Sequence, residues 1–79
     1  MDYDQDKVDD IVLALLCLTM FSEAGSTRAW KGHAWEALDR LHAKGYISDP
    51  KTKAKSVVMS EQGSKRAQEL FERHFARKG

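Results

Sequence analysis

Residues 36–63, EALDRLHAKGYISDPKTKAKSVVMSEQG, hold the pattern that decides the fold of this chain. Leu38 and Leu41 have helical spacing, and Gly45 follows where helices commonly end in a left-handed residue. An Asp-Pro turn, a lysine-rich tip and the β-branched run SVVMS then indicate a hairpin. Ser60 is a preferred N-cap for another helix. The stretch therefore predicts a helix, a β-hairpin and a second helix.

The apolar segment before this stretch predicts a first helix from Lys7 to Phe21, capped by Asp6. Its apolar residues cover nearly the whole circumference, which is typical of a helix buried on more than one side. A chain of 79 residues has a thin core and little protein to cover such a helix. We therefore expect a homodimer contact through this helix; the alternative is that the other helices wrap it fully.

The remaining segments complete the expected architecture. A second helix is expected from Ala34 to Lys44 with Trp35 on its core face, and a third after Ser60. The segment RAWKG fits either a short strand or a brief helical turn, and Trp30 within it is either core filler or a recognition anchor. We expect one α+β domain over residues 1–79, mostly helical, with three helices and a two- or three-stranded β-hairpin wing.

This order of elements resembles a winged-helix domain. The spacing of Leu38, Leu41, Gly45 and Ile47 is similar to the recognition helix and next strand of PadR- and MarR-type bacterial regulators. The segment VVMSEQG, residues 57–63, resembles the V-x-L-T-x-x-G exit from their wing. The whole chain, through MDYD, RAWKG and KAKSVV, is also similar to a family of bacterial proteins of this length with no assigned function. The first resemblance implies binding of double-stranded DNA and transcription regulation.

Charge is distributed unevenly, although the net charge is only +1. Residues 1–25 carry six acids against one lysine, whereas residues 26–79 carry twelve bases against six acids. Lysines at a wing tip would contact phosphates, and such binding weakens steeply with salt. The alternative is a tip kept soluble by charge, and Glu36 and Asp39 on the second helix would repel phosphate. The candidate nucleic-acid contacts are Arg40, Lys44, Lys51, Lys53 and Lys55.

Residue patterns for catalysis and metal binding are missing from the sequence. The three histidines and Cys17 lack the close pairing of zinc sites, and there is no Gly-rich phosphate loop or nucleophile elbow. We expect no enzyme activity, cofactor or metal. The acidic start is unlike a signal peptide, and the apolar run is too short to span a bilayer, so a cytoplasmic location without membrane contact is expected.

Two functions remain open from the sequence. The first is DNA binding and transcription regulation through the basic wing. The second is a protein-interaction module of the same shape, with Trp30 as a partner-binding residue, including an inhibitor from a mobile element such as an anti-CRISPR protein. These functions differ in whether the basic residues converge on one continuous face.

Overall fold

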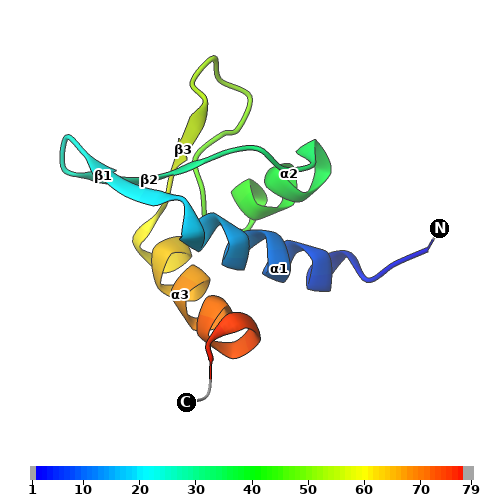
Figure 1. The fold of residues 1–79 in the computed structure, drawn as a ribbon. Helices are drawn as coiled ribbons and strands as arrows, with labels where there is room; N and C mark the ends of the chain where they lie inside the picture. The colour runs from blue at the N-terminus through cyan, green and yellow to red at the C-terminus, as the bar shows by residue number, and fades with distance from the viewer. Residues whose placement is uncertain (1, 78–79) are drawn as a thin grey trace.

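The computed structural model describes residues 2–77, in which three helices and three strands form. The elements are α1 Gln5–Leu18, β1 Met20–Glu23, β2 Ser26–Trp30, α2 Trp35–Ala43, β3 Ser56–Val58 and α3 Glu61–Phe75. Figure 1 shows α1 between α2 and α3, with the twisted sheet to one side of them. The three strands form one antiparallel sheet in the order β1-β2-β3. The expected α+β class, with three helices and a sheet of up to three strands, is confirmed.

Helix α1 begins and ends earlier than its apolar pattern predicts. Asp4, not Asp6, is the N-cap, because its carboxylate accepts a hydrogen bond from the Lys7 amide at 3.1 Å. The helix ends at Leu18, and the hydroxyl of Thr19 donates to the Leu16 carbonyl at 3.2 Å. The predicted end at Phe21 was wrong, since that residue belongs to β1, where pairing with β2 overrides a continued helix.

Strands β1 and β2 form a hairpin around a two-residue turn. Ala24 and Gly25 have φ of 51° and 82°, and positive φ at both turn residues matches the right-handed twist of hairpin strands. The ambiguous segment RAWKG therefore contributes to a strand, with Trp30 opposite Ser56 of β3. A winged helix has a further helix ahead of its recognition helix, whereas this chain has the β1–β2 hairpin in that position.

The outgoing strand of the predicted hairpin, between Gly45 and the Asp-Pro turn, is reduced to one isolated bridge. Ile47 pairs with Met59, and the Ser48 amide donates to the Val58 carbonyl at 2.9 Å. The returning strand β3 pairs instead with β2 along its other edge. Residues 49–55 form the lysine-bearing loop, which projects from the sheet in Figure 1.

The core lies between the inner face of the sheet and the three helices, with α1 packed against both α2 and α3. Its largest fully buried apolar side chains are Leu13, Leu16, Leu38, Leu41, Val57 and Leu70. Met59 and Val57 both face this core, as the strand alternation predicts. Within the described residues no helix is long and apolar enough to cross a membrane.

Helix α3 begins against the backbone that follows α2. The Ser60 hydroxyl accepts from the Gly63 amide at 2.9 Å and donates to the Gly45 carbonyl at 2.6 Å. Gly45 has the expected left-handed φ of 81°. A Cβ at Gly63 would overlap the carbonyl of Tyr46, so glycine at this position lets the first turn of α3 approach that backbone. The serine and glycine of the segment VVMSEQG thus fix the angle between α3 and the end of α2.

Candidate nucleic-acid interface

The loop of residues 49–55 presents three lysines to solvent. Lys51, Lys53 and Lys55 are all exposed, and none takes part in an ion pair within the described part of the chain. The turn starts at Asp49, whose carboxylate accepts from the Lys51 amide at 2.9 Å. Pro50, in contrast, is buried and anchors the start of the loop. The loop therefore carries three positive charges that no side chain among residues 2–77 neutralises by an ion pair.

Lys31, directly after β2, holds this loop in place. Its ammonium donates to the carbonyls of Pro50 and Thr52 at 2.6 and 2.9 Å, and its amide donates to the Lys55 carbonyl at 3.1 Å. The same ammonium lies 5.9 Å from the centre of the Trp35 ring, within range for a cation–π interaction. Both ends of the loop are thereby tied to the segment between β2 and α2.

Two exposed tryptophans lie beside the two ends of the loop. Trp30 is 53% exposed and pairs across the sheet with Ser56, next to Lys55. Its ring lies on the outer face of the sheet, 5.1 Å from the ring of Phe21. Trp35 is 56% exposed, and its ring lies near the Lys31 ammonium, which donates to the carbonyls of Pro50 and Thr52. We call the group Trp30, Trp35, Lys51, Lys53 and Lys55 the aromatic–basic surface.

The expected burial of Trp35 was wrong. The buried side of α2 is formed by Ala37, Leu38 and Leu41, and Trp35 lies at the edge of that arc in the first turn. The Trp35 side chain is exposed at the beginning of α2, where its ring lies near the Lys31 ammonium. Sequence reasoning therefore missed Trp35 as a member of the aromatic–basic surface and Lys31 as the residue that connects Trp35 to the loop. The available signal was the spacing of Trp30, Lys31 and Trp35 in the sequence.

A shallow hollow lies beside the loop, between it and the β1–β2 turn. It has a volume of about 370 Å³ and is lined by Glu23, Ala24, Ser26, Arg28, Ala54 and Ser56. The Arg28 guanidinium donates to the Ser56 hydroxyl at 2.8 Å and to the Ser56 carbonyl at 3.1 Å. Arg28 thus fixes β3 to β2 and adds a further positive charge next to the loop.

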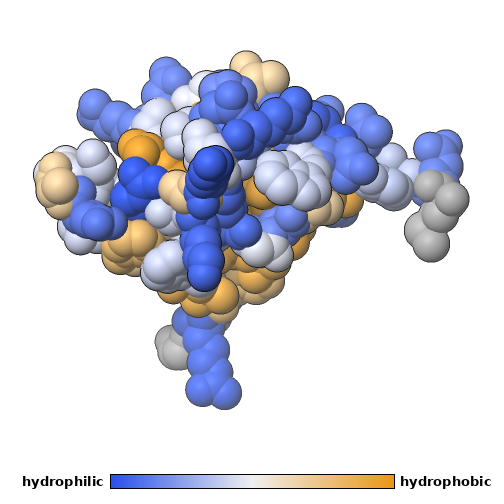
Figure 2. Space-filling model, turned by 90° about the horizontal axis from the view of Figure 1, so that it is seen from above, coloured by the Kyte–Doolittle hydropathy of each residue, from blue (hydrophilic) through white to orange (hydrophobic). Residues whose placement is uncertain are grey.

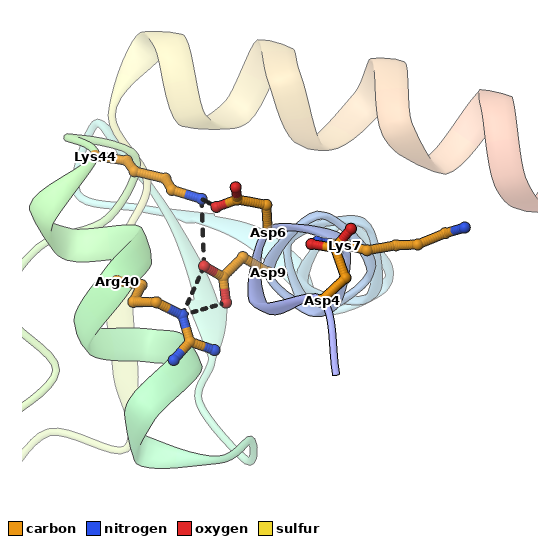
Figure 3. A network of polar contacts seen from close by, with 6 residues as sticks. All are labelled: Asp4, Asp6, Lys7, Asp9, Arg40 and Lys44. Carbon is orange, nitrogen blue, oxygen red and sulfur yellow. Dashed lines mark hydrogen bonds and ion pairs between the residues drawn. The ribbon is translucent and has the colours of Figure 1, made fainter. Parts of the chain in front are cut away.

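Arg40 and Lys44 do not join this surface, because both contact acids of α1. The Arg40 Nε donates to the two carboxylate oxygens of Asp9 at 2.9 and 2.8 Å. The Lys44 ammonium lies 3.2 Å from the same carboxylate and 3.4 Å from that of Asp6. Figure 3 shows Asp9 between the two cations, while Lys7 points away from them. We call Asp6, Asp9, Arg40 and Lys44 the α1–α2 network.

Electrostatics within the α1–α2 network keep Asp9, Arg40 and Lys44 ionised. Burial would raise the pKa of the Asp9 carboxyl, but hydrogen bonds from Arg40 and Lys44 outweigh it and hold that pKa below its usual value. Burial would likewise lower the pKa of Lys44, yet its contacts with Asp9 and Asp6 raise it. The hydrogen bond to Asp9 raises the pKa of Arg40. These two cations are already compensated within the fold, so they are poor phosphate ligands.

The histidines and the cysteine show no arrangement for metal chemistry in residues 2–77, where no three ligand-type side chains cluster. His42 donates from Nδ1 to the Ile47 carbonyl at 3.0 Å, which ties the end of α2 to the bridge. Cys17 is half-buried, and burial raises the pKa of its thiol. His42 therefore connects two parts of the fold, and Cys17 packs against the core.

Comparison with known proteins places the chain in a family. Residues 4–77 match a domain of unknown function, DUF6429, and the chain belongs to that family. A bacterial relative, the "Uncharacterized protein y4hR" of Sinorhizobium fredii, is 51% identical over 77 residues. That match covers 98% of this chain and 100% of the relative. No solved structure matches the chain.

Proposed function

We propose that this protein binds nucleic acid through the aromatic–basic surface. The observation that carries the proposal is the loop of residues 49–55, which presents three lysines without ion-pair partners in the described structure and is flanked by Trp30 and Trp35. Proteins that bind nucleic acids without sequence preference combine cations for the backbone with aromatic rings on which bases stack. Both components are present here, because Trp30 lies next to one end of the lysine loop and Trp35 next to the other.

The lysines would contact the phosphate backbone of the nucleic acid, and the tryptophans would contact its bases. Lysine is a flexible point charge, suited to phosphate contact more than to reading base edges. Trp30 and Trp35 expose ring surface on which an unpaired base could stack, a contact that tolerates any base. Arg40, a candidate nucleic-acid contact on the predicted recognition helix, is held by Asp9. We therefore favour binding that depends weakly on sequence over recognition of a specific operator.

The resemblance to a winged-helix domain also supports nucleic-acid binding. Helix α2, followed by the lysine loop and β3, has the order of a recognition helix and wing, and this order supports contact with double-stranded DNA. The β1–β2 hairpin in place of the preceding helix and the paired state of Arg40 and Lys44 favour a contact made mainly by the loop. Transcription regulation would follow only if such binding is selective in the cell.

Fluorescence anisotropy with a labelled duplex and a labelled single strand, each at two salt concentrations, tests the proposal. Three phosphate contacts give a slope of log affinity against log salt of about −2.7 for duplex and about −2.1 for single strand. Replacing Lys51, Lys53 and Lys55 by alanine should remove most of the binding and most of the slope. The matched control replaces three exposed cations of the C-terminal region: Lys65, Arg73 and Arg77. No binding at low salt, or equal loss in both triple variants, would refute the proposal.

One observation favours a second function, protein interaction. Tryptophan is enriched at binding hot spots, and the exposed pair Trp30 and Trp35 would suit a partner with an acidic, partly apolar surface. The α1–α2 network also interrupts the basic face that the sequence suggests. If neither nucleic acid binds at low salt while an acidic, aromatic-containing peptide does so in a Trp30-dependent way, this second function replaces the first.

A further inference from the structure

Helix α1 has two apolar sides, and the fold covers only one of them completely. Leu13 and Leu16 are fully buried against the core. The opposite side carries Val8, Ile11, Leu15 and Leu18, which we call the α1 stripe. Leu18 is 65% exposed, and the other three are half-buried and lie outside the main core cluster. The single chain therefore leaves the α1 stripe only partly covered.

The α1 stripe has the spacing of a helix–helix seam. Its members follow one another at intervals of three, four and three residues, which is the a/d pattern of coiled-coil heptads. At its N-terminal end the stripe continues into an apolar groove of about 440 Å³, bordered by Tyr3, Lys7 and Val12. Figure 2, seen from above, shows hydrophobic residues along the lower edge and in a smaller group toward the upper left, while hydrophilic residues cover most of that face. The spacing indicates that the occupant of this side is another helix.

The exposed area of the chain is large for a monomer of its mass. A compact monomer of 9.0 kDa exposes about 4,850 Å², and this chain exposes 5602 Å². The excess is roughly 750 Å². Part of it belongs to the extended segment ahead of α1, and the α1 stripe supplies apolar area.

We propose that the α1 stripe binds the same stripe of a second copy of this chain in an antiparallel, two-fold arrangement. In this register Val8 faces Leu18 of the other copy, and Ile11 faces its Leu15, so every member of the stripe has an apolar partner. Two-fold symmetry requires self-complementary contacts of this kind. The α1 stripe is therefore complementary to the same stripe of a second copy.

Charge decides between antiparallel and parallel pairing. The N-terminal end of α1 carries Asp4 and Asp10, which have no ion pair within the described residues, and Asp6, which is paired with Lys44; Lys7 is the one cation on the helix. Parallel pairing would bring two such acidic ends together and align the two helix dipoles. Antiparallel pairing separates the acidic ends by about 21 Å, the length of a 14-residue helix. The same acidic end makes an unrelated acidic partner unfavourable.

Sedimentation equilibrium under reducing conditions tests this inference. The wild type should sediment with twice the chain mass at tens of micromolar concentration. Leu18→Glu should weaken self-association at least about a hundredfold, because each dimer loses two apolar contacts and would bury two charges. Leu18 is exposed in the single chain, so this variant should fold, as circular dichroism would verify. Gln68→Glu, an exposed position on α3, adds the same charge and should leave the dimer unchanged.

A charge-pair variant tests the register. Val8→Lys combined with Leu18→Glu places opposite charges face to face in the antiparallel dimer and should restore association relative to Leu18→Glu alone. In a parallel dimer the same changes oppose like charges, and association would stay lost. The reversed pair, Val8→Glu with Leu18→Lys, gives the same readout if the first variant does not fold. A wild-type monomer, or a folded double variant that stays monomeric in both forms, would overturn the proposal.

Discussion

Replacing Asp9 by asparagine tests the role of the α1–α2 network. The Asp9 side chain is fully buried and accepts three contacts of 2.8 to 3.2 Å from Arg40 and Lys44. Asparagine has nearly the same volume, so the change leaves no cavity, but it removes the charge and turns one acceptor into a donor that faces two cations. The helices α1 and α2 lose their main polar connection.

The size of the effect follows from burial. Removing one partner of a buried ion pair costs about 3–5 kcal/mol. The side chains of Arg40 and Lys44 retain 25% and 35% exposure, so water can compensate both partly. We therefore expect Asp9→Asn to lower the free energy of unfolding by about 2–3 kcal/mol. For a domain of this size that corresponds to a melting temperature lower by roughly 10–20 °C.

Urea unfolding followed by circular dichroism measures this difference. The matched control is Asp10→Asn, the same change one residue further on, at a half-buried carboxylate with no ion pair in the described structure. We expect the control to stay within about 0.5 kcal/mol of the wild type. If Asp9→Asn were as stable as Asp10→Asn, the network would not hold α1 to α2. Arg40 and Lys44 would then be available to bind phosphates.

Three further predictions concern the same elements. The pKa of Asp9 in the folded protein lies below its ordinary value of 3.8. The ionised carboxylate therefore stabilises the fold fully above pH 3.8, and this stabilisation is lost as the pH falls through the folded pKa. Below about pH 4 the urea midpoint of unfolding should therefore fall more steeply with pH for the wild type than for Asp9→Asn. Gly63→Ala should destabilise the fold by at least about 3 kcal/mol in urea titration, because its Cβ would overlap the Tyr46 backbone. Gly32→Ala, in open space, is its control and should be nearly neutral. Ser60→Ala should lower the free energy of unfolding by about 1–2 kcal/mol through loss of the α3 cap, and an unchanged midpoint would contradict that capping role.

Local signals predicted the second half of the fold well. The leucine spacing of α2, the left-handed Gly45 and the Ser60 cap are each decided within a few residues, so the sequence displays them directly. The β1–β2 hairpin was less visible, since an apolar run continues from α1 through Phe21 and hides the helix end. The positive φ of Ala24 and Gly25 identifies the turn, but alanine is an unusual residue for that conformation.

Long-range pairing explains what sequence reasoning missed in the candidate site. Arg40 and Lys44 have the composition and spacing of a phosphate-binding helix face, yet Asp9 lies 31 and 35 residues away along the chain. No local pattern indicates that α1 brings this carboxylate to α2. Lys31 likewise reaches the loop through tertiary contact alone. The lysines of the loop could be predicted as exposed from the sequence, because they follow an Asp-Pro turn at the tip of a hairpin.

Intrinsic tryptophan fluorescence tests the central claim most directly, because the only two tryptophans of the sequence both lie in the aromatic–basic surface. Titration with an unlabelled thymidine oligonucleotide at low salt should quench the emission of the wild type, since bases stack on the exposed rings. The quenching should shrink in Trp30→Phe and nearly vanish when Lys51, Lys53 and Lys55 are replaced by alanine. An emission spectrum that stays unchanged, or quenching that survives the lysine replacements, would contradict nucleic-acid binding at this surface.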